Sequence, residues 1–350
     1  MASLDVEAWV KAYTPLMVLF PEIQPGTTRR GDRNPAFPEV APLNHDYHPR
    51  GVNIVLSHSS LGGRTLLRPF GWPQRADWRQ VLDDIESCGY ERDLDVLKGV
   101  SSSDRDSFWS VYAGIDKDIP EYGRRCYARV RQGTGINADR TMIQYWYPYF
   151  YNDFWNTHEM DWELVMVMFT NDPEPQPVLC ASSAHIGGHW LPWQEVQKAD
   201  ADGSRSETGT HPIIFVAHGS HANYFFGGRQ HDMTLAAAQL IVGLLNPPVR
   251  VDFVMAFEEG ARHIVEAALI PEPVDGVWPQ GDSWEDDWRW LNQRGRWGSP
   301  GRRWDLKIGD HAPFGPPLQG QRWSAPFQWI NTRCERAEDP TPPTRILPQR

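Results

Sequence analysis

Three side chains that can ligate a metal or transfer protons stand close together near the middle of the chain: His158, Asp161 and Glu163. They end an aromatic-rich segment, YWYPYFYNDFWNTHEMDWE, and the strand-like run LVMVMF follows directly. In an extended strand, residues i and i+2 project from the same face, so Asp161 and Glu163 are predicted to lie side by side. Two carboxylates that close repel unless a cation or a shared proton lies between them. The spacing therefore predicts a bound ligand.

The types of these side chains predict a divalent metal site. Asp153 lies just upstream, which gives a candidate ligand set of His158, Asp161, Glu163 and Asp153. Oxygen-rich sets with one imidazole suit Mg²⁺, Ca²⁺ or Mn²⁺ better than Zn²⁺. The alternative is that these residues are polar groups at a strand entry, hydrogen-bonded to neighbouring loops. The histidines farther along the chain favour the site over that alternative.

Histidines are concentrated in the same quarter of the chain. The segments PVLCASSAH and HPIIFVAHGSH read as strands that end in histidine, and SSAHIGGHW adds His189 after a Gly-Gly pair. Strand ends meet at the rim of a sheet, so we expect His185, His218 and His221 to approach the carboxylates there. These three are the candidate catalytic acids or bases, because histidine titrates near neutral pH; the alternative for each is a packed ring. Ser220 is a poor candidate for a nucleophile, since no Gly-x-Ser-x-Gly elbow surrounds it.

The elements that must position these groups are mostly short strands. An amphipathic helix is expected at 76–88 and a second helix at 234–245, after a short opening helix at 4–13. The segments that read as strands are 13–22, 51–56, 126–131, 141–149, 160–169, 177–185, 211–221 and 249–257. The aromatic run before His158 either fills the core or walls an amphipathic pocket.

These elements predict a mostly β fold. We expect an antiparallel two-sheet β-sandwich core with helical insertions and a Trp-rich irregular C-terminal segment, which begins at Trp278. The sandwich is expected to form a single elaborated domain over residues 1–335. Residues 336–350 are expected to be a flexible C-terminal tail.

Composition narrows the class of protein. The 350 residues carry a formal net charge of −11, which argues against nucleic-acid binding and against docking on anionic lipid. No window approaches the roughly 18 apolar residues of a transmembrane segment. The N-terminus lacks the basic-then-apolar order of a secretory signal, and the four scattered cysteines form no CxxC pair, so a cytoplasmic location is expected.

Several motifs together resemble the Vps62-related protein family. They are YTPLMVLFPE, DYHP, FYNDFWNTHEMDWELVMV, SAHIGGHW and THPIIFVAHGSHANYF, and the resemblance is strongest over residues 140–226. The HxxDWE core is also similar to that of the necrosis-inducing, NPP1-type proteins. This second resemblance implies a β-sandwich that binds a divalent cation, with His158, Asp161 and Glu163 as its ligands.

The upstream aspartate of the NPP1-type proteins does not align with this chain, because Asp153 lies closer to the histidine. Those toxins are secreted and act on plant membrane sphingolipids. No signal peptide is recognisable here, so the resemblance does not extend to toxic activity. A shared fold implies a site and leaves the substrate open.

Three functions fit these residues. The first is a divalent-metal-dependent enzyme, a hydrolase or related acid-base catalyst, whose cation polarises an oxygen of a small polar or amphipathic substrate or activates water. The second is cation-dependent binding of a lipid or glycan head group, or a membrane-associated role, without catalysis. The third is a structural metal site. An enclosed pocket with an open coordination position would favour the enzyme, and a shallow site would favour the binding protein.

Overall fold

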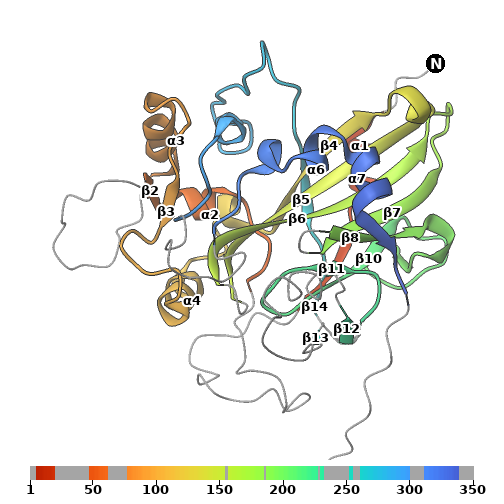
Figure 1. Ribbon diagram of the computed structural model, residues 1–350, viewed down its shortest axis with the longest axis horizontal. Coiled ribbons are helices and arrows are strands. Elements are labelled where there is room, and N and C mark those ends of the chain that lie inside the picture. Colours follow the sequence, from red (N-terminus) through yellow and green to blue (C-terminus); the bar gives the residue numbers. More distant parts are fainter. Residues whose placement is uncertain are drawn as a thin grey trace, which may run out of the picture.

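The computed structural model describes residues 5–19, 47–61, 77–153, 157–184, 187–227, 229–231, 252–254, 261–299 and 311–338. Strands make up most of the regular structure in these ranges, and the helices are short (Figure 1). The prediction of a mostly β fold is confirmed. None of the described helices is long and apolar enough to span a membrane.

The larger sheet has seven strands in the order β15-β4-β5-β6-β7-β8-β16. They are β4 (Arg125–Gln132), β5 (Arg140–Asn152), β6 (His158–Thr170), β7 (Pro177–Ala184), β8 (Gly187–Pro192), β15 (Glu266–Leu269) and β16 (Cys334–Arg336). The strands β5 and β6 have 13 residues each and lie side by side through the centre of the molecule in Figure 1. They position the candidate site, and the strands predicted at 126–131 and 141–149 pair antiparallel as β4 and β5.

A second sheet of five strands lies beside the first. It is built from β1 (Leu16–Leu19), β9 (Lys198–Ala199), β10 (His211–Val216), β11 (Asn223–Tyr224) and β14 (Ala261–Ile264). Two small two-stranded sheets pair β2 (Ser59–Leu61) with β3 (Leu94–Val96), and β12 (Arg229–His231) with β13 (Asp252–Val254).

Both large sheets are mixed, which corrects the expectation of a purely antiparallel sandwich. The strand β1 runs parallel to β10, and the edge strands β15 and β16 run parallel to β4 and β8. Hairpins force neighbours in sequence to be antiparallel, but these pairs join segments far apart in the chain. The alternation of apolar residues is the same for both directions, so it could not distinguish them.

The helices open and flank this sheet core. They are α1 (Val6–Ala12), α2 (Asn53–Leu56), α3 (Trp78–Ser87), α4 (Arg105–Gly114), α6 (Gln321–Ser324) and α7 (Pro326–Arg333). The helices α1, α3 and α4 begin after Asp5, Asp77 and Asp104, whose carboxylates accept hydrogen bonds from backbone N–H groups of the first turn. The predicted helices at 4–13 and 76–88 are confirmed.

The predicted strand at 51–56 is wrong, because this segment forms the one-turn helix α2. All four residues of α2 are buried. A helix buried on every side shows no apolar stripe, and its sequence then cannot be told from that of a short strand.

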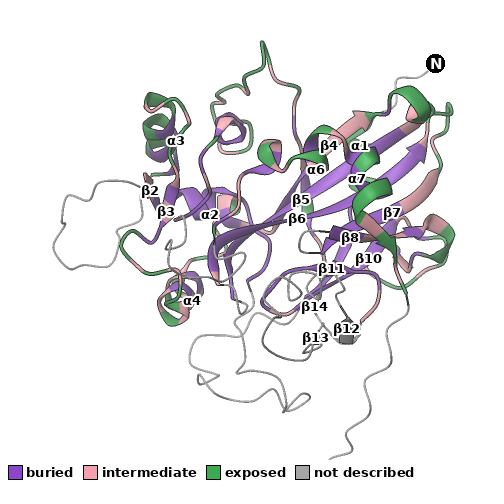
Figure 2. Ribbon diagram, viewed as in Figure 1, coloured by how far each residue is buried: buried purple, intermediate pink, exposed green. Residues whose placement is uncertain are grey.

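The seven-stranded sheet separates two apolar cores. On one face, Val165 and Val167 of β6 pack with residues of β1 and β10 in the five-stranded sheet. On the other face, Trp162 and Leu164 pack with residues of α2, α3, α4, α6 and α7. Figure 2 shows β5 and β6 buried and the outer faces of α3, α4 and α7 exposed. The predicted alternation along β6 is confirmed from Trp162 to Met168.

The C-terminal segment packs its indoles on the helical side of this sheet. Trp288, Trp290, Trp297, Trp323 and Trp329 are buried in the same core as Trp162. This segment contains two short helices, α6 and α7, that the sequence did not indicate. Arg336, the first residue of the expected tail, ends β16, and residues 339–350 lie outside the described residues, as does the helix expected at 234–245.

Candidate functional site

Asp161 is the centre of a buried polar cluster at the start of β6. In the antiparallel pairing of β5 and β6, Asp161 lies opposite Tyr149 and Glu163 lies opposite Tyr147. Both carboxylates are buried and continue the face that carries Val165 and Val167 farther along the strand. The sequence prediction that they share one face agrees with this register.

Three donors hold the carboxylate of Asp161. Its Oδ1 accepts from the backbone N–H of Trp162 at 2.9 Å. Its Oδ2 accepts from Asn152 Nδ2 at 3.1 Å and from His221 Nδ1 at 3.2 Å. Burial by itself would raise the pKa of Asp161, but the hydrogen bond from His221, the nearby charges of His158 and His221, and the hydrogen bond from Asn152 outweigh it and lower the pKa.

His221 reaches Asp161 from a tight turn after β10. Backbone bonds from His221 N to Ala217 O (3.0 Å) and from Ala217 N to Ala222 O (2.9 Å) close the turn. Gly219 and His221 adopt left-handed backbone angles, with φ of 77° and 58°. This unusual conformation of His221 aims its ring at β5, where it stacks on Tyr149 with ring centroids 4.0 Å apart and planes 11° apart.

His158 joins the cluster because the backbone reverses next to it. Strict alternation would place His158 on the opposite face from Asp161. Met160 interrupts that alternation with a left-handed φ of 51°. The ring Nδ1–H of His158 donates to the carbonyl of Met160 at 2.7 Å, and the imidazole lies close enough to Asp161 to lower its pKa. His158 keeps 7% of its surface exposed.

Positive charge from the C-terminal segment balances the two carboxylates. The half-buried Arg322 of α6 interacts electrostatically with both Glu163 and Asp161, and these charges oppose the lowering of its own pKa by burial. Glu163 also accepts a hydrogen bond from the hydroxyl of Ser183, which in turn accepts from Leu164 N. The repulsion that the spacing predicted is therefore relieved within the protein. Sequence reasoning missed Arg322, and only its position beside Trp323 marked it as part of a buried segment.

Several polar atoms beside Asp161 are buried without a hydrogen-bond partner among the described residues. They are Tyr149 OH, Ser220 Oγ, His221 Nε2 and both side-chain polar atoms of Asn223. Leaving such a group unpaired costs about 1–3 kcal/mol, so a set of them in one place is unusual. Tyr149 lies opposite Asp161 in the sheet and stacks on His221, and Ser220 precedes His221 in the same turn.

The other predicted site residues have different surroundings. Asp153 faces Arg105, whose Nε lies 3.1 Å from its Oδ1, and its backbone N–H donates to Gly219 O. His218 is half-buried in the same turn as His221, and His185 lies outside the described residues. His211 lies at the opposite end of β10 and bonds to Thr14 O at 2.7 Å.

Within the described ranges, no group of three or more His, Cys, Asp or Glu side chains is arranged to hold a metal ion. The predicted set of four ligands is divided instead among other partners. Asp153 faces Arg105, Glu163 bonds to Ser183, and Asp161 accepts from three donors. Two members of the set, His158 and Asp161, remain adjacent.

No protein-family model matches this chain, and no curated protein matches it. Solved structures do match. One is the non-toxic HaNLP3 protein, at 16% identity over 43% of this chain and 52% of that chain, with a TM-score of 0.25. Another is Necrosis and Ethylene inducing Protein 2 from the causal agent of cocoa's Witches Broom disease, at 16% identity over 41% and 50%, with a TM-score of 0.23. A third is NLPPya in complex with mannosamine, at 17% identity over 50% and 59%, with a TM-score of 0.26.

The chain thus spans about half the length of the necrosis-inducing (NLP) proteins that it matches. The link to NPP1-like proteins exists at low coverage and low TM-score, and the resemblance to Vps62-related proteins is not shown. TM-scores of this size do not establish a shared fold, so no residue role is transferred from these structures.

Proposed function

We propose that this protein binds a hydroxyl-rich head group, of a glycan or glycolipid, at the Asp161 cluster without transforming it chemically. One observation carries the proposal: buried polar atoms of Tyr149, Ser220, His221 and Asn223 have no partner among the described residues, and Tyr149 and His221 adjoin a carboxylate whose charge is balanced within the protein. A ligand that supplies partners to these atoms would remove their desolvation cost.

The chemistry of these atoms favours hydroxyl groups on the ligand. Ser220 and Tyr149 can each donate or accept, Asn223 offers donors and an acceptor, and Nε2 of His221 can pair with a hydroxyl group whether the ring is charged or neutral. Sugar hydroxyls likewise donate and accept. The carboxylates of Asp161 and Glu163 have counter-charges from within the protein, so the ligand need not be a cation.

Access to the cluster is from the side of Asp161 and His158. The side chain of Asp161 is 12% exposed, whereas that of His221 is 2% exposed. A head group would enter past Asp161 and His158 and reach the turn at 217–222. The backbone hydrogen bonds of this turn join its own residues to one another and to Asp153. A small shift of the turn would therefore widen the opening beside Asp161.

A divalent cation that bridges the protein to the head group is the second candidate. The favouring observation is the geometry of His158, whose Nδ1–H is fixed by Met160 O, so that Nε2 would be the ligating atom. Metal-bound histidines are commonly oriented in this way. Mg²⁺, Ca²⁺ or Mn²⁺ would then be held by His158 and Asp161, with Glu163 released from Ser183. A metal-dependent hydrolase would further require turnover, for which His221 is the nearest base.

The proposal is tested by measuring sugar binding to conservative variants. Glucosamine and mannosamine, the sugars named in two NLPPya complexes, are suitable probes, and glucose serves as a neutral comparison. Tyr149→Phe and Ser220→Ala each remove a hydroxyl that has no partner among the described residues. Each should weaken binding about fivefold, the value of one hydrogen bond, without lowering the Tm of the free protein.

Tyr47→Phe is the matched control, because it removes a buried, unpartnered tyrosine hydroxyl in the core on the other face of the sheet. Its sugar affinity should equal that of the wild type. Wild-type affinity in both site variants would refute the proposal. A loss of binding in EDTA that Mg²⁺, Ca²⁺ or Mn²⁺ restores, and that His158→Gln abolishes, would establish the cation-dependent form. Formation of a product from a glycan substrate would establish the enzyme.

A further inference from the structure

A pocket lies on the opposite face of the seven-stranded sheet from the Asp161 cluster. It has a volume of about 470 Å³ and is formed between α2 and the C-terminal half of α4. His58, which follows α2, packs against Phe150 in the helical core, with ring centroids 5.9 Å apart. This volume falls within the range of small-molecule sites. Nothing in the proposed head-group binding involves it.

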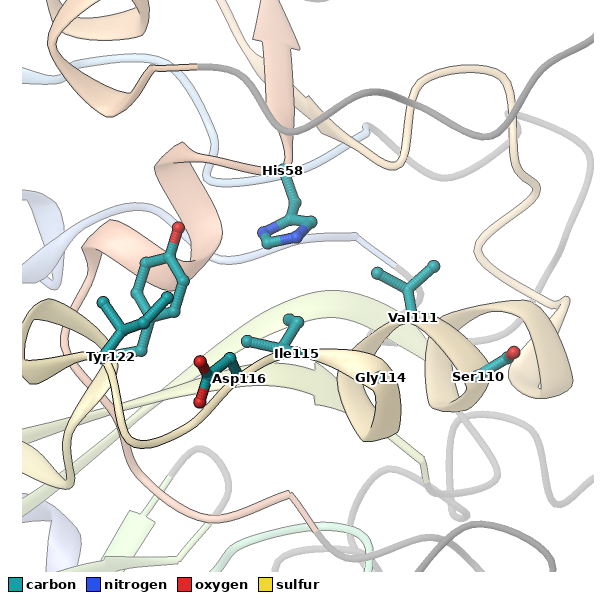
Figure 3. Close-up of a pocket in the computed structure, with 8 residues that line it drawn as sticks. His58, Ser110, Val111, Gly114, Ile115, Asp116 and Tyr122 are labelled. Atoms are coloured by element: carbon teal, nitrogen blue, oxygen red, sulfur yellow. The ribbon is translucent and has the colours of Figure 1, made fainter.

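The walls of the pocket are apolar and its rim is acidic. Figure 3 shows His58 facing Val111 and Ile115 across the pocket, with Asp116 lying between Ile115 and Tyr122. Tyr122 is buried, and Asp116 is exposed at the rim. One carboxylate therefore stands at the edge of a cavity that is otherwise lined by aliphatic groups, two aromatic rings and Ser110.

The charges around this pocket favour a cation. Asp116 is followed by Asp118 and Glu121 in the same short segment. The basic residue between them, Lys117, directs its ammonium group over the ring of Tyr112, 4.7 Å from the ring centroid. On the opposite wall, His58 Nδ1 lies 2.7 Å from the carbonyl of Ile54 and donates to it, which fixes the orientation of the ring.

We propose that this pocket binds a small organic cation, an ammonium group carrying an aromatic or aliphatic substituent. The Asp116 carboxylate pairs with the ammonium, and the rings of Tyr122 and His58, whose centroids lie 6.4 Å apart, offer their faces to it. The substituent fills the space between Val111 and Ile115. A carboxylate beside aromatic faces is the combination that distinguishes an ammonium from a neutral group of the same shape.

The test compares two probes that differ mainly in charge, benzylamine and benzyl alcohol, by titration calorimetry and ligand-observed NMR. The protein should bind benzylamine at least about threefold more tightly. Asp116→Asn should remove this preference. The variant keeps the fold, because an asparagine side-chain oxygen can still accept from Asp118 N, as Asp116 Oδ1 does at 3.1 Å.

Asp118→Asn is the matched control, since it makes the same change of net charge two residues away and outside the pocket lining. It should leave most of the preference intact. Gly114→Phe places a ring at the pocket wall, where an added Cβ meets nothing within 4 Å, and should abolish binding of both probes. Equal binding of the two probes, an equal effect of the two aspartate variants, or unchanged binding in Gly114→Phe would each overturn the proposal.

Discussion

Two buried carboxyl groups of β6, two residues apart, have pKa values shifted in opposite directions. Asp161 accepts from three donors and lies near two imidazoles, and its pKa is lowered despite burial. Glu159 is fully buried, and burial raises its pKa to about 7, although the backbone N–H groups of Ser299 and Val96 donate to it. Glu159 Oε1 has no partner among the described residues. Burial alone therefore does not decide the charge state of a carboxyl group; the surrounding charges and donors do.

The difference arises from the partners on the two faces of the sheet. Asp161 faces the turn that carries His221 and the guanidinium of Arg322. Glu159 faces the helical side, where the carboxyl group of Asp95 raises its pKa further. The left-handed residue Met160 lies between the two carboxyl groups and reorients the chain. One site is built to hold a negative charge, and the other to hold a proton near neutral pH.

Removal of the Asp161 carboxylate should have the largest effect. Asp161→Ala leaves three donors unpaired and the charge of Arg322 only partly balanced, and should lower the free energy of unfolding by about 4 kcal/mol. Denaturant unfolding at pH 7 measures this loss. Asp161→Asn keeps one acceptor and should lose less. A loss below about 1 kcal/mol for Asp161→Ala would show that the cluster does not stabilise the fold.

Replacement of Glu159 by a neutral side chain should raise the free energy of unfolding at neutral pH and above, whereas loss of Asp161 lowers it. The folded protein keeps a proton on Glu159 up to a pKa of about 7, whereas the unfolded chain releases it near 4.5. The wild type should therefore lose stability as pH rises from 4.5 to 7, by about 3 kcal/mol in total. Glu159→Gln should remove this loss and be the more stable protein at pH 8. Unfolding curves from pH 4 to pH 8 measure it, and parallel pH profiles of the two proteins would contradict it.

Removal of the positive charge of Arg322 should raise the pKa of Asp161 toward the direction seen for Glu159. Arg322→Met keeps the apolar length of the side chain but leaves Asp161 and Glu163 with less positive charge, and should cost about 2 kcal/mol at pH 7. Stability that depends on ionised Asp161 is lost as pH falls through its lowered pKa, and this loss should begin at a higher pH in the variant. Acid unfolding monitored by fluorescence measures the shift.

Arg129→Met is the control for that variant, because the guanidinium of Arg129 stacks on Trp323, 3.8 Å from its ring centroid, without contacting the Asp161 cluster. Its acid unfolding should begin where that of the wild type does. An equal shift in both variants would assign the effect to packing of the aromatic rings.

The smallest effect is expected for the imidazole at Asp161. His221→Asn removes the stacking on Tyr149 and the donor at 3.2 Å, while asparagine tolerates the left-handed backbone at this position. The variant should lose about 1 kcal/mol and show a raised pKa for Asp161, which NMR titration of the side-chain carboxyl would measure. An unchanged pKa would mean that the other donors and charges are enough to keep the pKa of Asp161 low without His221.

Much of the fold followed from local patterns. The reading of 160–169 as a strand predicted which face each residue from Trp162 to Met168 occupies, because successive side chains of a strand point to opposite faces of the sheet. The spacing of Trp78, Val81 and Ile85 predicted α3. The same reasoning failed at 51–56, where a fully buried helix has no polar face, and for the direction of the edge strands, which no residue pattern encodes.

The candidate site was likewise predicted from the sequence only in part. The residue types and the two-residue spacing of Asp161 and Glu163 predicted two carboxylates on one face, with a cation or a shared proton between them as a bound ligand. Tertiary structure alone decided what meets that need. Arg322 arrives from the C-terminal segment, and His221 from the turn after β10. Spacing along a strand determines only which side chains are neighbours within it, whereas contacts between distant segments depend on strand order and on the path of the chain.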